Sequence, residues 1–308
     1  SCGYFTEGVQ NTMNLFRPRL RNYEALAPFY LHSNTYYDNV FYNGLYQELQ
    51  ERPISELSKQ WFTYVDGQVE LELIDSVLFD MPAQFFFEHL DRNQVDAFTS
   101  YLQKKKPDAF AYLLQAKSIE RLGQADRWDN EAMDTLAIKI ERQKVDSILN
   151  LPHDGFMLRK WRFSALRLTK LLNDSTRFFA QYADWFENES TPSPERALLE
   201  MYCADLSVGA KRNVHLVRSF LTSTVRQMRS KERYDKRFSE EAMALTTSTR
   251  EKATHIVLSE LDNPGKCLIE LKKIYVMDPQ NPFLDFMLIR EINKIENWML
   301  AQEHTGNE

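Results

Sequence analysis

Two apolar helices joined by a proline-containing elbow are predicted between Lys266 and Met299, and they constrain the fold more than any other stretch. The first helix has an apolar face at helical spacing, formed by Leu268, Leu271, Tyr275 and Val276. Pro279 forbids its continuation, and Asn281 with Pro282 is suited to cap and open the next helix. The second of these helices is so apolar that it needs neighbours on more than one side, as the inner helices of a stacked array have.

The second helix carries a longer stripe, spaced four, four, three and four residues apart: Leu284, Leu288, Ile292, Ile295 and Met299. Four more apolar side chains widen this stripe: Phe283, Phe286, Met287 and Ile289. We therefore predict that the stripe faces inward and that Glu291 and Glu296 lie on the outer arc of the helix. Solenoids end on a polar cap, whereas this face stays apolar to Met299, so the sequence leaves open whether the array continues beyond Glu308.

Composition favours a purely helical protein. The 308 residues include only 9 Gly, and the long periodic runs are rich in Leu, Glu, Lys, Arg and Gln. A hydrophobic share of 43% excludes wholesale disorder. A formal net charge of −6 does not suggest a nucleic-acid binder. The chain has no run of about 18 apolar residues, so no transmembrane helix is predicted.

The elbow also carries a resemblance to a repeat family. The string from Tyr275 to Pro282 resembles the junction between tetratricopeptide repeats, where one helix ends near Asp-Pro and the next opens soon after. The Trp, Gly, Tyr and Ala positions of the consensus are mostly missing. Pairs of helices are predicted to start 38, 45 and 43 residues apart, near Phe156, Pro194, Ser239 and Pro282. Regular repeats are tighter, at about 34 residues.

This resemblance implies an all-α fold, a right-handed α-solenoid of antiparallel helix pairs over residues 80–308. An irregular aromatic-rich arm with short helices is expected over residues 1–79, because eleven aromatic residues lie within the first 46 positions. Their rings either anchor the arm on the helical body, the commoner use, or form a platform for sugars or a partner. After Gly67 the pattern is compatible with a hairpin or a helix, and we favour the helix because a lone hairpin is marginal.

Caps and periodicity predict further helix boundaries. Asp91 has capping-box spacing to Gln94 and is expected to open a helix, as is Ser193, which is followed by Pro194. Long helices are predicted over residues 129–149, 211–228 and 240–261. In the first of them, the side chains expected inside are Leu136, Ile140 and Leu149.

The start of the chain resembles the cut lipobox of a bacterial lipoprotein, because the small residues Ser1 and Gly3 flank Cys2. The resemblance implies lipidation of Cys2 and a lipid-anchored location in the bacterial cell envelope, on the periplasmic or outer-membrane face. An ordinary cysteine near a terminus is the alternative. Together with the Asp-Pro elbow and the paired helices, this start makes the chain similar to tetratricopeptide-like lipoproteins of the envelope. Cys203 and Cys267 lie in helical apolar patterns, where free cysteine behaves as a small hydrophobe.

Motifs point to no catalytic residue. The chain lacks GxGxxG, GxxxxGK(S/T), HExxH and GxSxG. None of its six His has a second His at helical spacing. Glu88, His89 and Asp91 resemble an acid–base cluster, but such residues at a helix end are more often solvated. We therefore predict no enzyme activity, no cofactor and no metal site.

Positive charge is concentrated in two stretches that can form a basic binding face. One contributes Arg218, Arg226 and Arg229, and the other contributes Arg159 and Arg162. A groove lined by them would suit an acidic partner, an anionic glycan or a phospholipid surface. The alternative is a solvated helix face, paired in part with the acidic segment between residues 38 and 96.

The predicted function is a non-enzymatic helical-repeat scaffold that mediates protein–protein interaction at the bacterial cell envelope. It would reach the membrane only through a lipid anchor and would not bind nucleic acid. One alternative is a glycan-binding lipoprotein resembling the SusD-like class of starch uptake, which also builds on tetratricopeptide-like helices but is usually much longer. The other is an enzyme with an unrecognised site, which a deep pocket with convergent carboxylates or His would favour.

Overall fold

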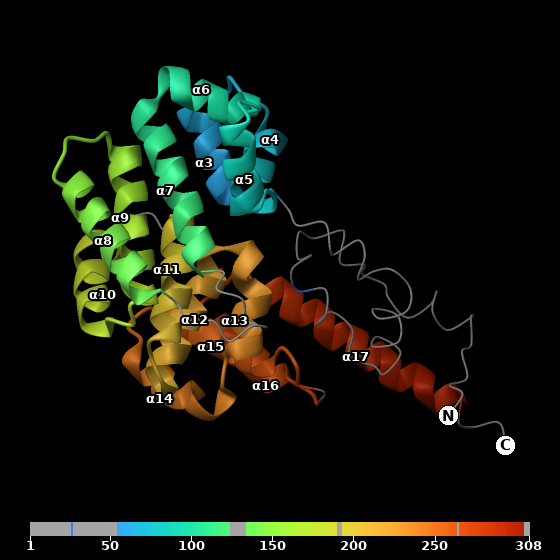
Figure 1. Ribbon diagram of the computed structural model, residues 1–308. Helices are drawn as coiled ribbons and strands as arrows, with labels where there is room; N and C mark the ends of the chain where they lie inside the picture. Colours follow the sequence, from blue (N-terminus) through green and yellow to red (C-terminus); the bar gives the residue numbers. More distant parts are fainter. Residues whose placement is uncertain (1–25, 27–53, 124–133, 190–192, 264, 305–308) are drawn as a thin grey trace. The chain divides into compact units, whose positions relative to one another are not determined.

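In a computed structural model of the chain, the described residues are Leu26 and residues 54–123, 134–189, 193–263 and 265–304 (Figure 1). Every element in these ranges is helical and none is a strand, which confirms the prediction of an all-α fold. Cys2 and most of the arm predicted before residue 80 lie outside the described residues.

The described helices belong to two compact units that divide between residues 206 and 207. We call residues 54–206 the first unit and residues 207–304 the second unit. The boundary predicted at residue 79 falls within the first unit, because a helix before it packs on helices after it. The Trp61 ring lies 5.7 Å from that of Phe98 and 5.8 Å from that of Tyr112.

The first unit comprises α3 (Glu56–Tyr64), α4 (Leu71–Asp75), the π-helical turn η3 (Ser76–Asp80), α5 (Ala83–Asp91), α6 (Ala97–Lys105), α7 (Pro107–Gly123), α8 (Thr135–Leu149), α9 (Gly155–Leu171), α10 (Ser175–Tyr182), the π-helical turn η4 (Ala183–Glu187) and α11 (Pro194–Asp205). Its main core joins α3 to α9 through large aromatic side chains, among them Trp61, Tyr112 and Trp161. A smaller core lies between α9, α10 and α11, around Phe178 and Phe186.

A buried ion pair ties three helices of the first unit together. The ammonium of Lys160 on α9 contacts the Glu195 carboxylate on α11 and donates to Gln60 Oε1 on α3 at 2.9 Å. The same ammonium lies 5.7 Å from the Trp61 ring and 4.8 Å from the Phe156 ring. Burial lowers the pKa of Lys160, and the Glu195 charge opposes this change. Neither charge is tolerable inside without the other, so the pair fixes how these helices meet.

Two local predictions in the first unit are confirmed. Ser193 caps α11, because its Oγ accepts a hydrogen bond from Arg196 N at 3.2 Å while Pro194 takes the first helical position. After the turn at Gly67, whose φ of 66° suits glycine, the chain forms the helix α4 and not a hairpin.

The cap predicted at Asp91 is wrong. Asp91 is the last residue of α5, and the next helix starts at Asp96, whose Oδ1 accepts from Thr99 N at 2.8 Å. Between them, Asn93 adopts a φ of 57° and so ends α5 in a left-handed residue. Asp91 has capping-box spacing to Gln94 in the sequence, but the residue that caps the helix is Asp96, five positions later.

The inward face predicted for the long helix that ends at Leu149 is wrong for two of its three residues. Leu149 is partly buried against the core, but Leu136 and Ile140 are exposed on α8, whereas Ile138, Arg142 and Val145 are buried. Arg142 tolerates burial because its guanidinium is hydrogen bonded on several sides, to Thr169, Gln181 and Asp146. Because Arg142 lies on the covered face, the buried side of α8 differs from the side that the apolar stripe predicted.

The second unit comprises α12 (Gly209–Thr222), the 3₁₀ turn η5 (Thr224–Arg226), α13 (Gln227–Arg233), the 3₁₀ turn η6 (Lys236–Phe238), α14 (Ser239–Leu245), α15 (Thr249–Glu260), α16 (Leu268–Met277) and α17 (Leu284–His304). The helices predicted over residues 211–228 and 240–261 are therefore each broken in two. Hydroxyl side chains break the second, since Thr246 Oγ1 donates to Ala242 O at 2.8 Å and Ser248 caps α15.

The elbow between α16 and α17 forms where it was predicted. Asn281 is buried, and its Oδ1 accepts from Phe283 N at 3.1 Å just before α17 begins. Asp278, also buried, accepts from Arg250 Nε of α15 at 3.1 Å. The elbow is thus held by α15 and fixes the angle at which α17 leaves α16.

The orientation of α8 predicts opposite outcomes for two aliphatic side chains two positions apart. Ile138→Ala is expected to lower the free energy of unfolding by about 2–4 kcal/mol, because it leaves a cavity in the core. Leu136→Ala, at a position 69% exposed, is expected to change it by less than about 0.5 kcal/mol. Urea unfolding of both variants checks this, and an equal or larger loss for Leu136→Ala would contradict the orientation of α8.

Candidate functional site

The most unusual surface of the second unit is the outer side of α16. Its regular apolar face points to solvent: Leu268, Ile269, Tyr275, Val276 and Met277 are all exposed. Ile269 and Val276 protrude most, at 69% and 70% exposed. Ile274 is the one fully buried residue of this helix. Most of the apolar face predicted for this helix therefore lies on its exposed side within the described part of the chain.

On α17 too, the apolar stripe that was predicted to face inward is partly exposed. Leu288 and Ile295 of the predicted inward stripe are exposed, and its members Leu284 and Ile292 are half-buried. The covered side carries the residues that were expected only to widen the stripe: Phe283, Phe286, Met287 and Ile289. The Phe283 ring packs 4.5 Å from that of Phe220 on α12. The side chain of Met299, the last position of the stripe, lies outside the described residues.

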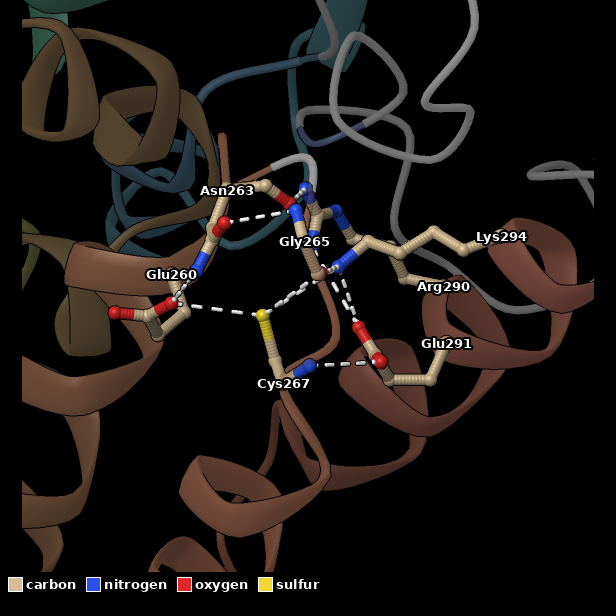
Figure 2. A network of polar contacts seen from close by, with 7 residues as sticks. All are labelled: Glu260, Asn263, Gly265, Cys267, Arg290, Glu291 and Lys294. Atoms are coloured by element: carbon tan, nitrogen blue, oxygen red, sulfur yellow. Dashed lines mark hydrogen bonds and ion pairs between the residues drawn. The ribbon is translucent and has the colours of Figure 1, made fainter. Parts of the chain in front are cut away.

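A buried polar network explains why α17 turns this way (Figure 2). Arg290, Glu291 and Lys294 of α17 are all at most 2% exposed. At helical spacing Arg290 and Lys294 share one face, and Glu291 lies at its edge, between that face and the side with Leu288 and Ile295. Figure 2 shows this face directed at the end of α15 and the loop that leads into α16. Three charged residues are thus inside, where the sequence pattern expected leucines.

Lys294 is the centre of the network. Its Nζ lies 2.5 Å from Glu291 Oε1 and donates to Gly265 O at 2.8 Å. The Cys267 Sγ lies 3.4 Å away. These contacts use the three donors of the ammonium in three directions. The buried charge is therefore compensated, and it pins the loop before α16 to α17.

Glu291 also holds the first residues of α16. Its Oε2 accepts a hydrogen bond from Cys267 N at 2.9 Å, at the N-terminus of that helix. A carboxylate there satisfies a donor that the helix cannot use and interacts favourably with the helix dipole. Cys267 itself offers no side-chain cap. The prediction that Glu291 lies on the outer arc is therefore wrong, because α16 needs this carboxylate from a neighbouring helix.

Arg290 extends the network to the end of α15. Its Nη2 donates to Asn263 O at 2.8 Å, and Asn263 Oδ1 accepts from Gly265 N at 2.9 Å. Asn263 also contacts the Glu260 carboxylate. Charged groups from two helices thus immobilise the loop between α15 and α16 from both sides.

The Cys267 thiol is a structural part of this network. It is fully buried, and its Sγ lies 3.5 Å from Glu260 Oε2 and 3.5 Å from Gly265 O. Burial raises the pKa of the thiol, and the nearby Lys294 only partly opposes this. The protonated thiol is a poor nucleophile, so this arrangement does not activate Cys267.

A second buried polar cluster lies around His255 on α15. Its Nδ1 lies 2.9 Å from Tyr234 Oη and its Nε2 lies 3.4 Å from Thr246 Oγ1. Burial lowers the pKa of His255 to about 4, and the charge of Arg218 adds to this. The imidazole is therefore neutral at pH 7 and supports α14 and the turn after α13 by hydrogen bonds alone.

The acid–base cluster considered at the end of α5 has ordinary surface partners. Glu88 accepts from Gln84 Nε2 at 2.9 Å and lies 3.9 Å from Arg92. Asp91 is exposed and His89 is half-buried. Taking each unit by itself, the described residues do not bring three His, Cys, Asp or Glu ligand atoms together for a metal ion.

Two residues of the predicted basic face belong to the first unit, and both have partners there. Arg159 forms an ion pair with Glu189 at 3.2 Å. The Arg162 guanidinium lies over the Trp185 ring at 5.6 Å, a cation–π contact. These contacts agree with the alternative that the arginines lie on a solvated face with local acidic and aromatic neighbours.

The other three basic residues belong to the second unit and differ from one another. Arg218 of α12 is paired with Glu251 of α15 at 3.4 Å. Arg226 is half-buried in η5, and Arg229 is exposed on α13. Their side chains thus differ in exposure and in the element that carries them, and the basic binding face stays a prediction.

No protein-family model matches the chain, and comparisons with curated proteins and with solved structures found no match either. Within the described ranges, no helix combines the length and the apolar character needed to cross a membrane.

Removing the central cation of the network is expected to be costly. Lys294→Met leaves the Glu291 carboxylate buried without its counter-charge and should lower the free energy of unfolding by about 3–5 kcal/mol. The matched control is Lys273→Met, since Lys273 and Glu270 have the same i, i+3 spacing on the surface, 4.0 Å apart. This control should change stability by less than about 0.5 kcal/mol. Similar losses in chemical denaturation would mean that the network does not hold α17.

The low pKa of His255 predicts a loss of stability in mild acid. Between about pH 6.5 and 4 the unfolded chain binds a proton that the buried imidazole does not, so stability falls as the pH drops through this window. From pH 7 to pH 5 the contribution is about 2 kcal/mol. In His255→Gln this part of the pH dependence should be absent. Urea titrations of both proteins at the two pH values measure it, and parallel pH profiles would contradict the assignment.

Proposed function

We propose that this chain is a non-enzymatic helical-repeat scaffold that binds a protein partner through the outward stripe of α17. The observation that carries the proposal is the reversal of α17, which leaves Leu284, Leu288, Ile292 and Ile295 along one accessible line. Regularly spaced aliphatic side chains on a rigid helix are the usual anchor of helix-to-helix recognition. In an array of helix pairs, such a stripe is where the next helix would stack.

The partner segment that fits this stripe is an amphipathic helix. The stripe runs from Leu284 to Ile295, a length of about 16 Å at 1.5 Å per residue. Leu288 and Ile295 are exposed, whereas Leu284 and Ile292 are half-buried, so the stripe is shallow, and all four of its members are aliphatic. A partner helix with apolar residues at i, i+4 and i+7 would cover it along three turns.

The internal chemistry supports a scaffold rather than an enzyme. Buried charges in both units are engaged with opposite charges, as in Lys160 with Glu195 and Lys294 with Glu291. The Cys267 thiol is held protonated. Groups used in this way position helices and are not directed toward a site where a substrate could react.

The remaining parts of the proposal come from the sequence. A right-handed stack of antiparallel pairs is suggested by the elbow at Asp278–Pro282 and by the spacing of the predicted pair starts. A location at the bacterial cell envelope is suggested by the lipobox-like start with Cys2. Fractionation of cells that express the wild type or Cys2→Ser tests the anchor separately from partner binding.

Photo-crosslinking tests the α17 stripe directly. A benzophenone amino acid at position 288 of the full chain should yield one dominant protein adduct in native cells, whereas the same probe at position 245 should not. Leu245 is the matched control because it is an exposed leucine of the same unit, on α14.

Leu288→Asp should weaken binding of that partner by at least about 30-fold, the effect of losing a central apolar anchor. Leu245→Asp should leave the affinity unchanged. Equal adducts at both positions, or equal affinity of both variants for the captured protein, would refute the assignment of the interface to α17.

A further inference from the structure

The outward face of α16 combines apolar side chains with a central cation. Lys272 follows Leu268 by four residues and Ile269 by three, and it precedes Tyr275 by three and Val276 by four. Residues three and four apart are neighbours on a helix surface. The exposed ammonium of Lys272 is therefore surrounded by four exposed apolar side chains.

This face has an uncompensated positive charge. The one acidic residue of α16, Glu270, is half-buried and lies 4.0 Å from Lys273. Among the described residues, no carboxylate forms an ion pair with Lys272. An anionic surface is thus the electrostatic complement of the ridge that these side chains form.

A protein partner fits this composition poorly. Lysine is depleted from the cores of protein interfaces, and docking a protein over the four apolar residues would bury the Lys272 charge among them. At a bilayer surface the same arrangement is favourable. The four-carbon stem of a lysine lies along apolar surface while its ammonium reaches the phosphates.

The shape of the ridge also favours a bilayer surface over a protein partner. Ile269 and Val276 are about 70% exposed and project beyond their neighbours. A fluid lipid surface closes around such side chains, whereas a protein would need a matching groove. Tyr275 has the amphipathic ring that settles at the level of lipid headgroups.

We propose that α16 is a docking ridge for an anionic phospholipid bilayer. The helix would lie in the plane of the interface, with Leu268, Ile269, Tyr275 and Val276 among the headgroups and upper acyl chains. Lys272 and Lys273 would contact lipid phosphates. The network of Glu291, Lys294 and Arg290 keeps the start of α16 fixed, so the ridge is presented without rearrangement.

Vesicle flotation tests the ridge without any lipid anchor. The full chain carrying Cys2→Ser is mixed with vesicles of phosphatidylcholine alone or with about one third phosphatidylglycerol. Binding is expected to the second kind only and should fall as salt rises. Lys272→Gln and Lys273→Gln should each weaken binding about fivefold at low salt. The control Lys211→Gln, at an exposed lysine of α12, should not.

The apolar contribution is tested by Val276→Asp, which should reduce vesicle binding at least about tenfold. Its matched control is Val208→Asp, the same change at a valine that is 78% exposed in the same unit. Leu288→Asp should retain vesicle binding, so failure of the α17 interface would leave this proposal standing.

Three results would overturn the proposal. The first is a folded chain that does not float with anionic vesicles. The second is equal vesicle binding by Val276→Asp and Val208→Asp. The third is a Val276→Asp variant that keeps vesicle binding but loses a dimer in sedimentation, which would make the ridge a protein interface.

Discussion

Buried charges that must be compensated are the constraint on which both units depend. A lysine inside a helical unit is tolerable only if a carboxylate lies within contact distance, and this restricts how the surrounding elements can be oriented. Lys160 and Glu195 set how α9 meets α11, with Gln60 of α3 completing the site. Lys294 and Glu291 set how α17 meets the loop before α16. Purely apolar contacts between these elements would restrict the rotation of each helix about its axis less than these ion pairs do.

The surface of the second unit follows from its network. Once Arg290 and Lys294 occupy the covered side of α17 and Glu291 lies at its edge, Leu288 and Ile295 beyond that edge face out. The same network fixes the first turn of α16, whose apolar face then points to solvent as well. The orientation of these helices therefore explains both the burial of the charged side chains and the exposure of the apolar ones.

The two outward faces differ in chemistry, and this difference separates their proposed roles. The stripe of α17 is aliphatic and shallow, which suits a partner helix. The ridge of α16 protrudes and has Lys272 at its centre, which suits an anionic lipid surface. A scaffold with both would hold a protein partner close to a membrane in a fixed orientation.

Periodicity and punctuation were enough to determine the helical class, the Ser193–Pro194 start of α11, the helix after Gly67 and the elbow near Asn281. Each of these depends on residues close in sequence, whose backbone preferences act locally. The break at Thr246–Ser248 was missed, because hydroxyl side chains compete with the helix weakly.

Only the tertiary structure decided which face of each helix is covered. Leu136 and Leu288 belong to regular apolar stripes and yet are exposed, while Arg142 and Glu291 are charged and yet are buried. Spacing tells which residues share a face. Whether that face is inside depends on partners far away in the chain, such as Thr169 for Arg142 and the backbone of Cys267 for Glu291. The sequence by itself therefore determined the helices, and long-range compensation of buried charge decided their orientation.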